Sequence, residues 1–123
     1  MSAIELGTYL RDAQQQHHAC IEACVECWTA CEMCSDACLH EENVERMVRC
    51  IRLDRDCAAI CRLAAEAMVR GSDLAARICA LCAEICEACG EECAKHADHH
   101  DHCRVCAEAC RRCAQECRRM AAA

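Results

Sequence analysis

Apolar and polar residues alternate along most of this chain in the pattern of an amphipathic helix. From about residue 17 to residue 120, small apolar residues return every third or fourth position, and Glu and Arg fill much of the sequence between them. Alternating steps of three and four residues put the apolar positions on one stripe of an α-helix, as in a coiled coil. Four such helices are predicted, over residues 17–40, 43–70, 73–95 and 99–120.

Start and stop signals separate these helices. Gly71 is expected to end the second helix as a C′ residue in the left-handed conformation. Asn43, Ser72 or Asp73, and Asp98 are the candidate N-cap residues of the later helices. Because the connections are short, neighbouring helices should run antiparallel. The sequence therefore predicts an all-α fold, an antiparallel four-helix bundle that forms a single domain over residues 1–123.

A helical lead is predicted before the first of these helices, over residues 3–16. Ser2 and Glu5 have the spacing of a capping box at its start. The apolar phase of the lead continues into the first long helix through Leu6, Leu10 and His17. The lead can therefore belong to one long helix or form an extra short N-terminal helix, and the pattern does not decide between them.

The interior stripe is built from cysteine, where a bundle normally has leucine. All 19 cysteines of the chain fall on it: Cys20, Cys24, Cys27, Cys31, Cys34, Cys38, Cys50, Cys57, Cys61, Cys79, Cys82, Cys86, Cys89, Cys93, Cys103, Cys106, Cys110, Cys113 and Cys117. Large aliphatic side chains are few, so the apolar core should be thin for a chain of this size. Bound metal is the expected source of additional stability.

Composition and charge exclude several classes of protein. The chain has no Pro and no Phe, and its formal net charge is −7 without a basic stripe, so neither a sheet nor a nucleic-acid partner is expected. The sequence shows neither a membrane span nor the pattern of a secretory signal, which predicts a cytoplasmic protein with no membrane partner. Thiols stay reduced in that compartment, and an odd number of cysteines also argues against a disulfide framework.

The spacing of the thiols suits a soft metal ion. Cβ atoms three or four residues apart on a helix lie about 5–6 Å from each other, so two thiolates can reach one ion. Cu(I) seeks thiolates, accepts two or three ligands and tolerates bridging sulfurs. Zinc prefers four ligands, which facing helices could supply, so a zinc or cadmium sink of the metallothionein type is the alternative. The uniform repeat singles out no reactive pair, and no enzymatic activity is expected.

Asp54 is the one carboxylate on the cysteine line of the second predicted helix, which has Met47 and Met68 at its two ends. Two interpretations stand side by side. The side chain can turn to the boundary and pair with Arg52 or Arg55, or it can face the interior and help to bind metal. The sequence gives both equal weight.

Histidines are expected at the ends of the bundle. His96 and His99 continue the interior lines of their helices and should meet at one end, where they could pass ions into the thiol core. Solvated helix-end histidines are the alternative, and this interpretation is preferred for His18, His40 and His102. At the opposite end of an antiparallel bundle we expect His17, Met68 and Met120.

The run C-x3-C-x2-C-x3-C-x2-C-x3-C, repeated in similar form along several helices, resembles the cytosolic bacterial copper storage proteins, a family of cysteine-lined four-helix bundles. The resemblance covers Cys20 to Cys117. It implies a homo-oligomer, typically a homotetramer, and a few non-cysteine ligands near one mouth, for which the matching residues are Met47, Asp54, His96 and His99. The predicted function is cytosolic storage and buffering of multiple Cu(I) ions, which limits copper toxicity.

Overall fold

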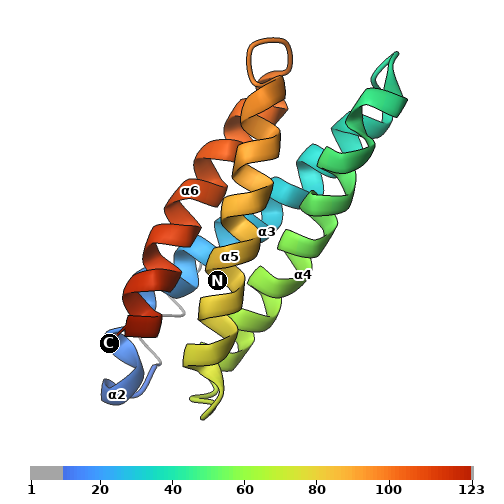
Figure 1. Cartoon of the computed structure of the whole chain (residues 1–123). Coiled ribbons are helices and arrows are strands. Elements are labelled where there is room, and N and C mark those ends of the chain that lie inside the picture. Colours follow the sequence, from blue (N-terminus) through green and yellow to red (C-terminus); the bar gives the residue numbers. More distant parts are fainter. Residues whose placement is uncertain (1–9, 123) are drawn as a thin grey trace.

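The structure is a computed structural model that describes residues 10–122. Its elements, in chain order, are α2 (Asp12–Gln15), α3 (His18–Leu39), the 3₁₀ helix η1 (Val44–Met47), α4 (Val48–Val69), α5 (Ala75–His96) and α6 (Asp101–Ala122). The four long helices run alternately up and down (Figure 1). No strand occurs among the described residues. The predicted all-α antiparallel four-helix bundle is therefore confirmed.

The four long helices enclose a central axis. Each of them packs against two others, because α3 contacts α4 and α6, and α5 contacts α4 and α6. The connections from α3 to α4 and from α5 to α6 meet at one end, which we call the histidine end (Figure 1). The opposite end holds α2, the connection from α4 to α5 and the end of α6, and we call it the α2 end.

The segment before α3 forms a separate helix. A turn at Gln16 and His17 interrupts the helical hydrogen bonding between α2 and α3, and the N–H of His17 donates to the carbonyl of Gln14 at 3.0 Å. Of the predicted lead at 3–16, residues 3–9 and the capping box of Ser2 and Glu5 lie outside the described residues. Within residues 10–122, the extra short N-terminal helix is the interpretation that holds (Figure 1).

The turn after α4 follows the expected glycine chemistry. Gly71 has a φ of 66°, and the N–H of Ser72 donates to the carbonyl of Ala67 at 2.9 Å, which is the long bond of a Schellman motif. The hydroxyl of Ser72 accepts the N–H of Leu74 at 3.1 Å just before α5 begins. Asn43 occupies the predicted N-cap position, before η1, although its side chain makes no capping hydrogen bond. The prediction of Asp98 as a cap was wrong, because α6 begins at Asp101.

The buried interior of the bundle consists mainly of cysteine and alanine side chains. All 19 cysteines are buried, and none is more than 3% exposed. Partly buried aliphatic and aromatic side chains pack beside them along the helix seams, among them Val25, Trp28, Ile51, Ile60, Ile78 and Ile85. None of the helices within residues 10–122 combines the length and apolar character that a bilayer crossing needs. The large side chains therefore seal the seams between the helices, and the axis is left to the thiols.

Candidate metal centre

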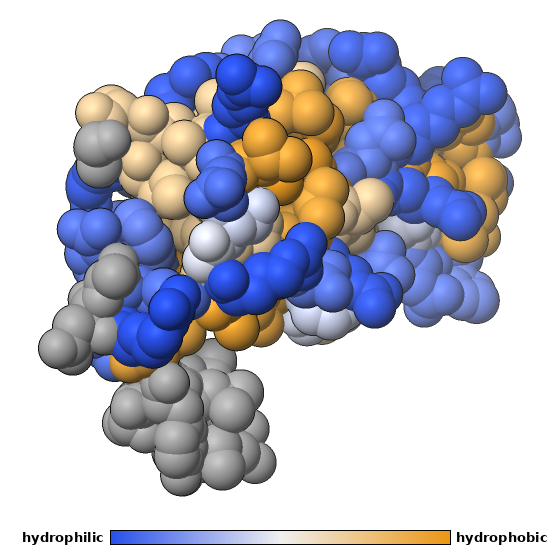
Figure 2. Space-filling model, turned by 90° about the horizontal axis from the view of Figure 1, so that it is seen from below, coloured by the Kyte–Doolittle hydropathy of each residue, from blue (hydrophilic) through white to orange (hydrophobic). Residues whose placement is uncertain are grey.

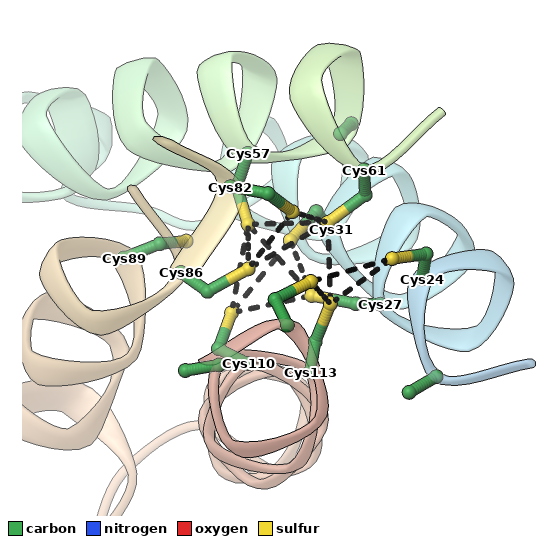
Figure 3. Close-up of a cluster of buried hydrophobic side chains, with 14 of the residues drawn as sticks. Cys24, Cys27, Cys31, Cys57, Cys61, Cys82, Cys86, Cys89, Cys110 and Cys113 are labelled. Atoms are coloured by element: carbon green, nitrogen blue, oxygen red, sulfur yellow. Dashed lines mark hydrogen bonds between the residues drawn. The ribbon is translucent and has the colours of Figure 1, made fainter. Parts of the chain in front are cut away.

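The thiols form a continuous network along the bundle axis. Helices α3, α4, α5 and α6 all contribute, and their sulfurs converge in the space between the ribbons (Figure 3). Cys57 Sγ lies 3.5 Å from Cys86 Sγ, and Cys61 Sγ lies 3.7 Å from Cys113 Sγ. Such contacts link residues up to 97 positions apart in the sequence, as between Cys20 and Cys117. The helical stripes predicted from spacing alone thus meet in one sulfur core.

These separations are those of sulfurs that share a metal ion. With metal–sulfur bonds of about 2.3 Å, two ligands lie about 3.8 Å apart in a tetrahedron and about 4.0 Å apart in a trigonal plane. Observed pairs lie close to these values, for example Cys31 and Cys106 at 3.7 Å and Cys34 and Cys103 at 3.9 Å. The helices therefore hold the thiols at ligand spacing before any ion is bound.

The possible binding groups share members. Sets of four sulfurs that all lie within 4.8 Å of one another include Cys24–Cys82–Cys113–Cys117, Cys27–Cys61–Cys86–Cys113, Cys27–Cys31–Cys57–Cys110, Cys31–Cys89–Cys106–Cys110 and Cys34–Cys38–Cys50–Cys103. Cys113, Cys27 and Cys31 each belong to two of these sets. A thiolate in two sets must bridge when both are occupied, so the geometry favours linked clusters over isolated sites.

Asp54 faces the interior of the bundle and is fully buried. Its Oδ1 accepts hydrogen bonds from the thiols of Cys89 at 3.2 Å, Cys93 at 3.4 Å and Cys106 at 3.3 Å, and Cys50 Sγ lies 3.8 Å from Oδ2. The interpretation in which Asp54 turns outward to an arginine was wrong. Burial, together with the nearby charges of Cys106 and Cys50, raises the pKa of this carboxyl to about 9. Asp54 is therefore protonated at neutral pH.

The thiols differ in acidity because they hydrogen-bond to one another. Hydrogen bonds to Cys106 and Cys110 raise the pKa of the Cys31 thiol, and burial adds to the effect. Hydrogen bonds from Cys110 and Cys31 to its sulfur lower the pKa of Cys106. The hydrogen bonds thus make some thiols more acidic than others, and a soft cation that enters the network can displace their protons.

His102 reaches the thiol network from the histidine end. Its Nδ1 lies 3.5 Å from both Cys34 Sγ and Cys103 Sγ, and its Nε2 lies 3.0 Å from Glu41 Oε1. Because a carboxylate oxygen only accepts, Nε2 carries the proton of the neutral ring and Nδ1 keeps its lone pair toward the thiols. The hydrogen bond from His102 lowers the pKa of Glu41.

The interpretation of His102 as a solvated helix-end residue was therefore wrong. A signal in the sequence was available, since His102 stands four residues before Cys106 and so on the edge of the same helical stripe. The structure does not bring His96 and His99 into the sulfur network in the same way. His96 Nε2 lies 3.1 Å from Glu92 Oε2, and His99 is exposed.

A cavity of about 580 Å³ opens at the histidine end. His96, His99 and His100 line it together with Met47 and Asn43. The expected meeting of histidines and Met47 at one end of the bundle is therefore observed. Met47 is only 2% exposed, so it lies between this cavity and the interior.

A sequence model of the copper storage protein family (Csp) matches residues 13–122, which is nearly all of the described chain and all 19 cysteines. The chain belongs to the copper storage protein family. The predicted recognition of this family is confirmed.

Similar proteins occur in several bacteria. The chain is 55% identical over 109 residues to the uncharacterised cysteine-rich protein YhjQ of Bacillus subtilis strain 168, covering 89% of this chain and 99% of that protein. It is 56% identical to the Cu(I)-bound copper storage protein BsCsp3, with a TM-score of 0.79 over 84% of this chain and 95% of that one. A cytosolic copper storage protein from Streptomyces lividans carrying five coppers is 44% identical, with a TM-score of 0.86 over 89% and 95% of the chains.

The arrangement combines tight sulfur spacing with exclusion of water. A thiolate in such a site binds soft ions strongly, because water does not compete for the ion and neighbouring sulfurs share it. The same burial keeps oxidants away from the thiols. Many soft ions can therefore be held together without chemistry on a substrate.

Proposed function

We propose that this member of the copper storage family stores and buffers multiple Cu(I) ions in thiolate clusters along the bundle axis. The observation that carries the proposal is the sharing of sulfurs between neighbouring groups of four. Cu(I) accepts two or three thiolates and bridging sulfurs, so shared groups fit it better than separate tetrahedral sites. The Cu(I)-bound relative supports the choice of ion. No turnover of a substrate is needed for this role.

All 19 cysteines, together with Asp54, are the proposed ligands. His102 joins this set, because its Nδ1 lies close to two thiols. His96 and His99 are proposed to collect ions at the mouth of the histidine end, where they line the same cavity. The double variant His96→Ala and His99→Ala should load more slowly than wild type, while His18→Ala at the opposite end should not. Equal loading rates would remove both histidines from the proposal.

Anaerobic titration of the reduced protein with Cu(I), against a chromophoric chelator, tests the storage function. We expect tight uptake of more than roughly ten ions per chain, since bridged Cu(I) approaches one ion per thiol. Saturation at one or two ions would indicate a chaperone or sensor and contradict the proposal.

The Cys61→Ala variant tests, in the same titration, whether the clusters share sulfurs. Cys61 Sγ lies within 4 Å of the sulfurs of Cys57, Cys82, Cys86 and Cys113. Loss of this thiol should therefore lower the number of Cu(I) ions bound per chain by more than the loss of a peripheral ligand would. Ser35→Ala is the matched control, because Ser35 is also buried in the bundle but offers no sulfur. Equal capacities of the two variants would argue against shared clusters.

A zinc or cadmium sink is not favoured. Four-ligand sites would limit zinc to roughly a quarter of the 19 thiols. The ratio of bound metal to protein at saturation therefore separates the two functions in one experiment. A higher capacity for zinc than for Cu(I) would reverse the assignment.

The proposed setting is the cytosol, and the proposed assembly is a homotetramer. The relative from Streptomyces lividans is a cytosolic protein, which supports the location. Several large apolar side chains are exposed on the surface of the bundle, including Leu39, Leu63, Leu74 and Leu81. Such residues can form a subunit interface. Light scattering of the apo protein tests the assembly, and a monomer at micromolar concentration would exclude it.

A further inference from the structure

The sulfur network also comes close to the surface at the α2 end. Cys20 is the most exposed of the cysteines, at 3%, and its Sγ lies 3.7 Å from Cys117 Sγ. A small cavity of about 100 Å³ borders Cys20 and is also lined by His17 and Met120. The outermost thiol layer at this end is therefore in reach of two further soft or borderline donors.

A second cavity shares two of its lining residues with the first, and we call it the outer cavity because no cysteine lines it. Its volume is about 300 Å³, and it is lined by Met68, Met120 and His17. Because His17 and Met120 line both cavities, they stand between the outer cavity and Cys20. The donors thus form a series from the outer cavity to the thiol network.

We infer that this series is a second soft-metal site, at which Met68, Met120 and His17 bind Cu(I) and pass it to Cys20 and Cys117. Thioether sulfur and imidazole nitrogen bind soft ions without losing a proton. They hold Cu(I) less tightly than thiolates do, so transfer into the core is favourable. The inference rests on the proposed function, because it needs a core that accepts Cu(I).

Helix α2 covers this site. Arg11 and Gln14 form part of the wall of the outer cavity. The amide of Gln14 is buried and donates from Nε2 to the carbonyl of Val69 at 2.7 Å, which ties α2 to the end of α4. A Cβ added to Gly71 would lie only 2.9 Å from Arg11 Nη2, so the residue just before α2 packs closely against the turn that follows α4. Figure 2 looks onto this end of the bundle and shows apolar residues between the polar side chains.

The cover is a single turn of helix, and such a short element contributes little stability of its own. Loss of the bond from Gln14 to Val69 should therefore displace α2 and open the outer cavity. Displacement leaves Met68 and Met120 in place, because both belong to the long helices. Opening α2 should speed the arrival of ions, whereas removing the two thioethers should slow it.

The test is the initial rate of anaerobic Cu(I) uptake by the reduced full chain, measured by the ultraviolet absorption of Cu(I)-thiolate bonds. Each variant is made in the His96→Ala and His99→Ala background, so that the histidine end contributes less. Met68→Leu with Met120→Leu should lower the initial rate and leave the final capacity unchanged. Met33→Leu is the control, because Met33 is 64% exposed on the outer face of α3. Gln14→Ala should raise the rate.

An unchanged rate in the Met68→Leu and Met120→Leu variant would overturn the site. If that variant does not fold, Gln14→Ala carries the test, and equal or slower uptake by Gln14→Ala would overturn the role of α2 as a cover. The wild-type capacity is measured in the same series. A wild-type core that saturates at one or two ions would refute the proposed storage function. A core that fills normally, at rates that the substitutions at the α2 end do not change, would refute the second site alone.

Discussion

Replacing Asp54 by Asn isolates the cost of a carboxyl group inside a sulfur core. The substitution keeps the shape of the side chain and removes its titration. An amide oxygen can still accept from the thiols of Cys89, Cys93 and Cys106, and the amide nitrogen takes the place of Oδ2, near Cys50. Any difference that depends on pH therefore reports the proton of Asp54.

Proton linkage gives the sign and the size of this difference. Burial raises the pKa of Asp54 from an ordinary 3.8 to about 9 in the folded protein. Between these values the unfolded carboxyl is ionised and the folded carboxyl keeps its proton, so the native state binds one proton more. The free energy of unfolding of the apo protein should then fall by about 1.4 kcal/mol for each pH unit. At pH 7, the loss of unfolding free energy relative to a pH below 3.8 has an upper bound of about 4 kcal/mol.

The assay is denaturant unfolding of the reduced apo protein, followed by circular dichroism at several pH values between 5 and 7. Over this range the Asp54→Asn variant should gain about 3 kcal/mol in unfolding free energy relative to wild type. Asp56→Asn is the matched control, because Asp56 is an exposed carboxylate on the same helix. Parallel pH profiles of wild type and Asp54→Asn would refute the reasoning.

Three further predictions concern single positions. Gly90→Val should destabilise the apo bundle by about 1–3 kcal/mol in thermal unfolding, because even a Cβ would lie 3.2 Å from Cys110 Cβ between α5 and α6; an unchanged Tm would contradict this. Gly71→Ala should cost about 1–2 kcal/mol in denaturant unfolding, because φ is 66°, and equal midpoints would count against it. Glu41→Leu should raise the share of His102 that carries its proton on Nδ1, as seen by ¹⁵N NMR, whereas Glu42→Leu should not. A tautomer ratio that is equal in both Glu variants would show that Glu41 does not orient the ring.

The repeat of the cysteines made most of the core predictable. A step of three or four residues fixes which face of a helix a side chain occupies, whatever the rest of the fold does. Short connections then leave few ways to arrange four helices of equal length. Cys20 and Cys117 could thus be assigned to one interior although 97 positions separate them.

Spacing did not predict the contacts that depend on rotation of a helix by part of a turn. Asp54 was equally compatible with the interior and the boundary, and its burial is decided by how α4 packs between α3 and α5. His102 lies at the edge of its stripe, where a small rotation decides between solvent and sulfur. The course of α2 was undecided for another reason, because the apolar phase of residues 3–17 continues unbroken while the backbone turns at Gln16.

The proposed ligands that are not sulfur are unevenly distributed along the axis. Asp54 contacts Cys50 and Cys93 in the half near the histidine end, and His102 contacts Cys34 and Cys103 in that same half.

Groups that consist of thiols alone lie in the other half, such as Cys24, Cys82, Cys113 and Cys117. A carboxyl oxygen is a harder ligand than a thiolate, and it must lose its proton to bind, so clusters that include it should hold Cu(I) less tightly. Ions should therefore be retained longest toward the α2 end and released first from the histidine end. A bundle with equal affinities at both ends would have no such direction, and we expect Asp54 and His102 to provide it in this chain.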